Sequence, residues 1–408
     1  MRNYPVFQIS EKGEKKLREG HVWAFDEELT LRSGNPRDGE IVDIFSQKDK
    51  YVGSGFFNSS SKIRIRVISK STNDRFDESF WRRRLSWAIR YRWDVMGETD
   101  FRCCRLIFGE ADQFPGLTVD RFENILVFQI LSLGMELMKN ELVSWILDIL
   151  RQEYGVIISA VYERSDVAVR EHEGLSQTTG YLYRAEGFSD DSGITQITEN
   201  GIRYSVDYIR GQKTGFFLDQ KYNRAAAAKL CRGKKVLDCC THTGSFALNA
   251  ARAGALSVTA LDVSGEALDM VRKNSELNGL SDRIETVKAD LFDYLETLQN
   301  ARTKPYDVII LDPPAFTKSR DTLKNAIKGY GEINERAMRI LPRGGYLATC
   351  SCSHFMTETY FKQMLHGAAE RAQVSLRQIE ARRQSPDHPI LWNVPETDYL
   401  KFFIFQII

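Results

Sequence analysis

The chain has 408 residues, which at roughly 100–200 residues per domain predicts two to four domains. It carries 56 Lys and Arg against 55 Asp and Glu, a formal net charge of +1, and its 42% hydrophobic and 27% charged residues are ordinary for a globular protein. This balance excludes a wholly basic nucleic-acid coat and an acidic solvating chain, and it leaves room for a local basic face.

No segment approaches the roughly 18 consecutive apolar residues of a membrane-spanning helix. The first residues, MRNYPVFQISEKGEKK, contain no apolar signal region. The seven cysteines include no C-x-x-C spacing, so a structural metal site is not expected. We therefore expect a cytoplasmic protein with reduced thiols, no membrane association and no bound metal.

The first region, residues 1–72, contains short strands separated by turns, with a polar linker at its end. One predicted strand, Lys62–Ile68, alternates strictly between charged and apolar residues from Lys62 to Val67. A period of two places Lys62, Arg64 and Arg66 on one face. Such a face can neutralise RNA phosphates, and a solvated strand face explains the same pattern equally well.

The second region, residues 73–193, mixes helical and strand patterns and is predicted to be an α+β domain. Its clearest helices are expected at Glu78–Met96 and near Glu136–Glu153. Strands are expected at Gly116–Asp120, Ile125–Leu131 and near Val156–Tyr162.

The third region, residues 194–408, opens with a hairpin signal at Glu199-Asn200-Gly201. Five short apolar strands then alternate with helical patterns, which predicts a mostly parallel sheet with helices on both faces. Two further strands, Val374–Glu380 and Leu400–Ile407, have no helix between them and can form an antiparallel hairpin at one edge. A seven-stranded α/β sheet of this kind is typical of class I methyltransferases rather than of a six-stranded dinucleotide fold.

Ligands of open α/β sheets bind at the carboxyl ends of the strands. Three consecutive strands end in the acids Asp238, Asp262 and Asp290, and the first is followed by a turn containing Thr243 and Gly244, where the backbone can approach a ligand. The G-x-G-x-x-G fingerprint is absent, so a pyrophosphate cradle is not expected. The acids fit an adenosine without phosphates, as in S-adenosylmethionine, although a helix N-cap alone explains Asp290 equally well.

The fourth and fifth strands end in two further motifs. Asp312 precedes two prolines, which stiffen the chain and fix this residue at the strand tip. The fifth strand ends in a motif with two thiols, Cys350 and Cys352. A thiolate that adds to carbon 6 of cytosine makes carbon 5 electron-rich, so the motif suits pyrimidine methylation. Small buried apolar cysteines explain the same residues structurally.

Over nearly its whole length, the sequence resembles the bacterial 23S ribosomal RNA cytosine-C5 methyltransferases that carry an N-terminal PUA domain. The resemblance rests on four blocks in particular: Gly20–Phe25, Gly53–Asn58, Gly109–Arg121 and Gly211–Gln220. It implies a PUA RNA-binding domain over residues 1–72, a middle domain over 73–193 and a methyltransferase domain over 194–408.

The resemblance also implies roles for individual residues. Cys352 would be the nucleophile, and Asp312 would hydrogen-bond or protonate the base near nitrogen 3. Phe217, Asp219, Gln220 and Arg224 would border the methionine end of S-adenosylmethionine. With these four, the residues expected to bind the cofactor are Asp238, Thr243, Gly244, Asp262, Asp290 and Asp312.

The partner implied is 23S ribosomal RNA, bound in part by Lys62, Arg64 and Arg66, and a homodimer is left open. Two alternatives remain at this point. One is a methyltransferase acting on a guanine nitrogen, which needs no thiol. The other is an RNA-binding assembly factor that keeps the fold without turnover. Cys350 stands two residues before Cys352 and leaves the choice of nucleophile open.

Overall fold

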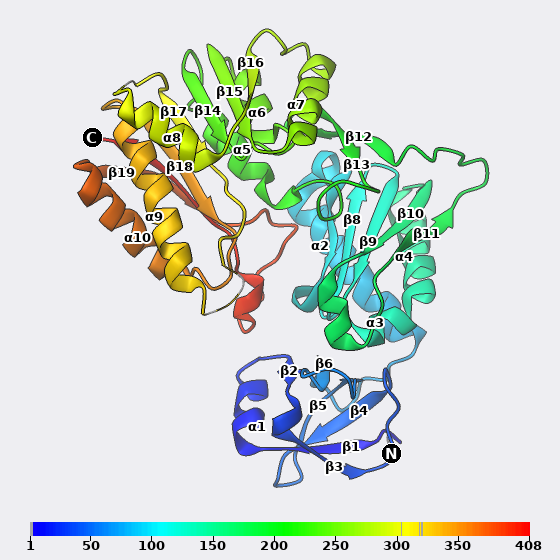
Figure 1. Cartoon of the computed structure of the whole chain (residues 1–408). Helices are drawn as coiled ribbons and strands as arrows, with labels where there is room; N and C mark the ends of the chain where they lie inside the picture. Colours follow the sequence, from blue (N-terminus) through cyan, green and yellow to red (C-terminus); the bar gives the residue numbers. More distant parts are fainter. Residues whose placement is uncertain (1–2, 303, 318, 320) are drawn as a thin grey trace. The chain divides into compact units, whose positions relative to one another are not determined.

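The computed structural model describes residues 3–302, 304–317, 319 and 321–408, and the chain divides into two compact units (Figure 1). Unit 1 contains the residues up to Gln196 together with Val206–Leu218 and Pro386–Thr397. Unit 2 contains Ile197–Ser205, Asp219–Ser385 and Asp398–Ile408. The first two predicted regions thus fall in one unit, and the three-domain division stays a prediction.

Unit 1 begins with a six-stranded sheet in the order β2-β6-β5-β4-β1-β3. Its core is formed by apolar residues that alternate along the strands, such as Phe7 and Ile9 of β1 and Ile65 and Val67 of β6. The elements are β1 (Val6–Ile9), α1 (Glu11–Arg18), β2 (Trp23–Ala24), η1 (Asp26–Glu28), β3 (Leu29–Ser33), β4 (Ile41–Phe45), β5 (Tyr51–Phe57) and β6 (Ile65–Ser69).

The predicted strand Lys62–Ile68 is wrong at its start, because β6 begins only at Ile65. Ser61 explains the difference: its hydroxyl accepts a hydrogen bond from the backbone N–H of Ile63 at 3.1 Å and so bends the chain before the strand. Of the three basic residues expected on one strand face, only Arg66 lies within β6.

Unit 1 continues with a five-stranded sheet in the order β11-β10-β9-β8-β7. The predicted helix at Glu78–Met96 is confirmed and begins where the side chain of Asp77 caps the N–H of Phe80. Gly97, with φ 70° and ψ 167°, breaks it directly after Met96, and a short helical continuation runs to Phe101. The elements are α2 (Glu78–Phe101), β7 (Cys103–Phe108), η2 (Gly109–Asp112), β8 (Leu117–Phe122), β9 (Ile125–Ile130), α3 (Leu133–Leu137), α4 (Lys139–Tyr154), β10 (Ala160–Ser165), η3 (Ala168–Glu173) and β11 (Thr178–Arg184).

The hairpin predicted at Glu199-Asn200-Gly201 is confirmed as the two-stranded sheet β12 (Ile194–Glu199) and β13 (Ile202–Asp207). Asn200 and Gly201 have φ angles of 53° and 74°, as a tight two-residue turn requires.

Unit 2 is built on a seven-stranded sheet in the order β16-β15-β14-β17-β18-β20-β19. The predicted α/β fold is confirmed: the first five of these strands run parallel, and β20 pairs antiparallel with both β18 and β19. The strands are β14 (Lys235–Cys239), β15 (Ser257–Asp262), β16 (Ile284–Lys288), β17 (Val308–Leu311), β18 (Tyr346–Ser351), β19 (Leu376–Arg382) and β20 (Lys401–Ile407).

Figure 1 shows α8, α9 and α10 on one side of this sheet and α6 and α7 on the other. The helices and short turns are η4 (Leu218–Gln220), α5 (Lys221–Ala228), α6 (Ser245–Arg252), α7 (Gly265–Leu277), α8 (Leu291–Asn300), α9 (Leu323–Ile340) and α10 (Glu358–Ala372), with η5 (Pro395–Thr397) in unit 1. Strand order reverses between β14 and β17, which is where doubly wound sheets bind their ligands. Within the described ranges, no helix is both long and apolar enough to cross a membrane.

Candidate active site

The loop after β14 has an unusual backbone. Cys240 and His242 have φ angles of 59° and 52°, and Gly244, which precedes α6, has 83°. Asp238 holds the loop from within β14: its Oδ2 accepts hydrogen bonds from Thr241 Oγ1 at 2.6 Å and from the N–H of Ala247 at 2.9 Å. Burial raises the pKa of Asp238 to about 7. Asp238 therefore shapes the loop.

Asp262, at the end of β15, faces the same loop. Its Oδ2 accepts a hydrogen bond from the N–H of His242 at 2.9 Å, and its Oδ1 accepts one from the N–H of Ser264 at 3.0 Å. Each carboxylate oxygen can accept more than one hydrogen bond, so the acid is fixed in place and still able to bind hydroxyl groups. Burial lowers the pKa of His242 to about 4, which keeps its imidazole neutral near pH 7.

Asp290 is the N-cap of α8. Its Oδ1 accepts hydrogen bonds from the N–H groups of Phe292 and Asp293 at 2.8 and 3.3 Å, and the residue is exposed. The structural explanation of this acid is thus confirmed, while its second, exposed oxygen leaves the cofactor role as a prediction.

Asp312, Gln220 and Cys350 form a connected cluster at the tips of β17 and β18. The Cys350 thiol donates to Asp312 Oδ1 at 2.9 Å, and Gln220 Nε2 donates to the same oxygen at 3.1 Å. Burial raises the pKa of Asp312, against the stabilising hydrogen bond from Cys350. The pKa of Cys350 is also raised well above its ordinary value, first by burial and then by Asp312. The thiol of Cys350 is therefore held protonated.

Cys352 has a different setting. It follows the last residue of β18 and is partly exposed, whereas Cys350 is 1% exposed. The next residue, Ser353, is buried, and its Oγ lies 3.2 Å from the hydroxyl of Tyr330 on α9. The chain after β18 is therefore anchored at Ser353, while the preceding residue, Cys352, stays partly exposed.

The short segment η4–α5 supplies three of the predicted cofactor residues. Asp219 accepts a hydrogen bond from the Tyr399 hydroxyl at 2.6 Å, and Gln220 Oε1 accepts one from Asn223 at 2.7 Å. Arg224 is buried and donates to Glu199 Oε1 at 2.7 Å. Burial opposes the charge of Arg224, yet Glu199 raises its pKa overall. Asn223 and Glu199 were missed by sequence reasoning, since Asn223 lies within α5 and Glu199 ends β12 of the hairpin, and neither stands at the carboxyl edge of the seven-stranded sheet.

Asp219 Oδ1 and Thr243 Oγ1 are among the buried polar atoms of unit 2 that have no hydrogen-bond partner among the described residues, as is Asp238 Oδ1. Buried polar atoms are almost always hydrogen-bonded, so an acceptor and a hydroxyl left in this way indicate a ligand with polar groups of its own. The amine, carboxylate and hydroxyls of S-adenosylmethionine fit them. Phe217, the remaining predicted cofactor residue, belongs to unit 1, and its role stays a prediction.

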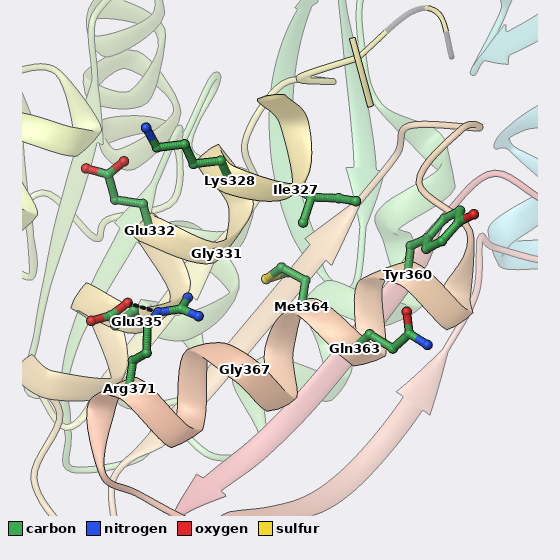
Figure 2. Close-up of a pocket in the computed structure, with 10 residues that line it drawn as sticks. All are labelled: Ile327, Lys328, Gly331, Glu332, Glu335, Tyr360, Gln363, Met364, Gly367 and Arg371. Carbon is green, nitrogen blue, oxygen red and sulfur yellow. Dashed lines mark hydrogen bonds and ion pairs between the residues drawn. The ribbon is translucent and has the colours of Figure 1, made fainter. Parts of the chain in front are cut away.

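A separate groove lies between α9 and α10 and is shown in Figure 2. Its lining combines apolar residues such as Ile327 and Met364 with an ion pair between Glu335 and Arg371 at 2.6 Å. None of the strand-end acids lines it. The groove is therefore distinct from the candidate site.

The predicted RNA-binding residues of unit 1 differ in their solvent exposure and in their ion pairs. Lys62 is exposed. The Arg64 side chain forms an ion pair with Asp26 at 2.8 Å. Arg66 is bound to Glu173 at 2.8 Å and to Glu110 at 3.3 Å, with 12% of its side chain exposed. Arg66 thus connects β6 to η2 and η3, and of the three residues Lys62 is the one most open to solvent.

A doubly wound sheet of this strand order, with acids at its carboxyl edge and a thiol motif after β18, defines a class I methyltransferase. Residues 185–406 match the family described as S-adenosylmethionine-dependent methyltransferase, and residues 7–70 match a PUA-like domain. A protein from Streptococcus mutans described as a SAM-dependent methyltransferase has the same fold, with a TM-score of 0.79 at 22% identity, over 98% of this chain and 100% of that one.

Two curated relatives share the name ribosomal RNA large subunit methyltransferase I. The protein from Klebsiella pneumoniae is 37% identical over 405 residues, 99% of this chain and 98% of the relative. The one from Photobacterium profundum is 42% identical over 393 residues, 96% of each. The chain belongs to this family of S-adenosylmethionine-dependent methyltransferases, and its cofactor is S-adenosylmethionine.

Proposed function

We propose that the protein methylates carbon 5 of a cytosine in 23S ribosomal RNA, with Cys352 as the nucleophile. The RNA class is supported by the names of the relatives and by the PUA-like match. The choice of atom is supported by the two thiols after the fifth strand of the fold.

The contrast between Cys350 and Cys352 carries the proposal. Only a thiolate attacks carbon 6 of the base. Cys350 is buried, and its thiol donates a hydrogen bond to Asp312. Both the burial and the neighbouring Asp312 raise the pKa of this thiol and so oppose its ionisation. Cys352 is partly exposed at the same edge of the sheet. The difference in burial thus assigns Cys350 to structure and favours Cys352, which lies beyond the end of β18, as the group for chemistry.

Asp312 is suited to assist the ring. Burial raises its pKa, so this carboxyl group takes up a proton more readily than an exposed aspartate, and in its protonated form it donates to nitrogen 3 of cytosine while Cys352 adds to carbon 6. Both side-chain hydrogen bonds that it makes within the described part of the chain fall on Oδ1, which leaves Oδ2 for the base. After carbon 5 is methylated, a base removes the carbon 5 proton and the Cys352 thiolate leaves.

The cofactor, when bound, supplies the electrophilic methyl group. We assign the ribose hydroxyls to Asp262 and the adenine amino group to Asp290. Thr243 and Gly244 would line the turn that follows β14. Asp219, Gln220, Arg224 and Phe217 would face the methionine end, and Asp238 would support the turn. The unsatisfied Asp219 Oδ1 and Thr243 Oγ1 are the observations that favour this placement.

The test is covalent trapping on RNA that contains 5-fluorocytosine, in the presence of S-adenosylmethionine. Fluorine cannot leave as a cation, so the adduct should persist through denaturation. We expect a complex with the unmodified protein and with Cys350→Ala, and none with Cys352→Ala. Methylation activity that survives Cys352→Ala would instead favour a nitrogen target, and failure to bind S-adenosylmethionine in calorimetry would favour an assembly factor without turnover.

A further inference from the structure

Lys401, the first residue of β20, is a buried lysine that the reaction described above does not use. It is 2% exposed. In the antiparallel pairing of β18 with β20, Lys401 lies opposite Ser351 and Phe402 lies opposite Cys350. The pairing therefore brings a long cationic side chain to the end of β18, where Cys352 follows.

The ammonium group is held by backbone carbonyls. Nζ donates to the carbonyl oxygen of Ser353 at 2.7 Å and to that of Tyr399 at 2.7 Å. Ser353 directly follows Cys352, so the lysine fixes the backbone beside the thiol. The same residue is held from α9 by Tyr330, and its N–H donates to Ser351 Oγ at 3.3 Å. The chain at Cys352 is thus clamped from β20 and from α9.

Burying a charge without an opposite charge is expensive. Within the described residues, Lys401 has no carboxylate within ion-pair distance. The nearby acid Asp398 is paired with Arg383 at 3.4 Å, and Arg383 also binds Glu358 at 2.5 Å. An anion that forms beside the lysine would compensate its charge, and the Cys352 thiolate is the group placed to do so.

The charges around the lysine agree with this view. Burial lowers the pKa of Lys401 to about 8, Cys352 and then Asp398 raise it, Arg383 lowers it, and Cys350 raises it. With a pKa near 8, the ammonium form prevails at pH 7. Besides Asp312, which binds Cys350, Tyr330 is a titratable group that faces the thiols, and burial raises its pKa to about 12, so that it stays neutral.

We propose that Lys401 is a positioning residue for Cys352: it holds the Ser353 carbonyl and stabilises the neighbouring thiolate by its positive charge. This inference rests on the proposed role of Cys352 as the nucleophile. It also makes Cys352 the more acidic of the two thiols, since Cys350 faces the carboxylate of Asp312 and not a cation.

The experiment is alkylation of Cys352 by iodoacetamide as a function of pH, read by mass spectrometry on the tryptic peptide, whose fragments distinguish Cys350 from Cys352. For Lys401→Met we expect the midpoint of the rate profile to rise by about one pH unit or more, so that the rate at pH 7 falls about tenfold. Lys401→Arg should restore the midpoint. Lys401→Gln keeps a donor for Ser353 without the charge and should behave like Lys401→Met.

The rate on the high-pH plateau separates charge from structure. A displaced loop that shields the thiol lowers the plateau, whereas loss of charge raises the midpoint and leaves the plateau equal or somewhat higher, because a thiolate of higher pKa is more nucleophilic. Lys304→Met is the matched control, because Lys304 also donates to a backbone carbonyl, that of Leu341 at 2.9 Å, but precedes β17 at the opposite edge of the sheet. An unchanged midpoint in both Lys401→Met and Lys401→Gln overturns the inference.

Failure of this inference and failure of the proposed function give different results. If Lys401 has no effect on the thiol but 5-fluorocytosine RNA is still trapped at Cys352, the nucleophile stands and the inference falls. If no RNA is trapped while the midpoint shifts as expected, the lysine acts on a thiol that serves some other reaction.

Discussion

The thiol of Cys350 and the carboxylate of Asp312 share a hydrogen bond of 2.9 Å across neighbouring parallel strands, and Gln220 binds the same carboxylate oxygen. Because the thiol is the donor, the bond keeps its proton on Cys350. These hydrogen bonds fix Asp312 at the end of β17. They involve Cys350 and not Cys352, the thiol two residues further on. We therefore expect substitution of Cys350 to disturb the position of Asp312, and substitution of Cys352 to stop the methylation reaction.

Replacing Cys350 by alanine should lower stability without removing the nucleophile. The partly buried Asp312 loses the hydrogen bond from the Cys350 thiol, one of its two side-chain hydrogen bonds within the described residues, and a loss of this kind costs about 1–3 kcal/mol. We expect a reduced free energy of unfolding in urea and a reduced turnover number, with covalent trapping on 5-fluorocytosine RNA retained. Complete loss of trapping in Cys350→Ala, with the fold intact, would transfer the nucleophilic role to Cys350.

Asp238 should make stability depend on pH. Burial raises its pKa in the folded state from 3.8 to about 7, so the folded protein binds more protons than the unfolded chain between these values. Its contribution to stability is therefore fully present below about pH 4 and is lost as the pH rises to about 7. Three pKa units correspond to about 4 kcal/mol.

Comparison with Asp238→Asn, which does not titrate, isolates this effect. The difference in free energy of unfolding, wild type minus variant, should fall by up to about 4 kcal/mol between pH 4 and pH 7 and then stay level. Urea denaturation at intervals of half a pH unit would measure it. A difference that stays constant across this range would mean that Asp238 remains ionised.

Gly244 should be needed for cofactor binding. Its φ of 83° is left-handed, and a Cβ there would lie 3.1 Å from Val271. Gly244→Ala should cost about 1–2 kcal/mol and shift the turn that contains Thr243. Gly279→Ala is the matched control, with a φ of 66° and no atom within 4 Å of the added Cβ. Calorimetric titration with S-adenosylmethionine should show weaker binding in the first variant only.

The buried pair of Arg224 and Glu199 allows structure and ligand binding to be separated. Arg224→Met removes one half of the buried ion pair with Glu199 and should cost about 3–5 kcal/mol. Adding Glu199→Gln removes the uncompensated charge and should recover most of that loss. If Arg224 also borders the methionine end of the cofactor, the double variant will be stable yet bind S-adenosylmethionine weakly; normal affinity would restrict Arg224 to a structural role.

Much of unit 2 could be predicted from sequence because its signals are local. Apolar strands followed by acids mark the carboxyl edge of a parallel sheet, and Asn200-Gly201 supplies the positive φ angles of a tight turn. The residues that hold the acids could not be predicted. Gln220 and Asp312 are 92 residues apart along the chain, and no local sequence pattern predicts the hydrogen bond between them.

The basic strand shows why periodicity alone misleads. Alternation placed Lys62, Arg64 and Arg66 together, but it does not show which of them find acidic partners. Ser61 bends the chain before β6, and Glu110 and Glu173, distant in sequence, bind Arg66. Lys401 illustrates the opposite case: a lysine before an apolar strand gives no local signal, and only the pairing of β18 with β20 shows where it lies.

Lys62 and Arg66 should respond differently when each is replaced by alanine. Lys62 is exposed, so Lys62→Ala should leave stability unchanged and weaken RNA binding, and the slope of log affinity against log salt should become shallower by about 0.7 for one lost phosphate contact. Arg66→Ala removes the ion pairs with Glu173 and Glu110 and should therefore lower the melting temperature. Lys48, exposed in the turn after β4, provides the control for charge alone. Filter binding of a 23S fragment across a salt series measures the slopes; equal slopes for Lys62→Ala, Lys48→Ala and the wild type would remove Lys62 from the RNA contact.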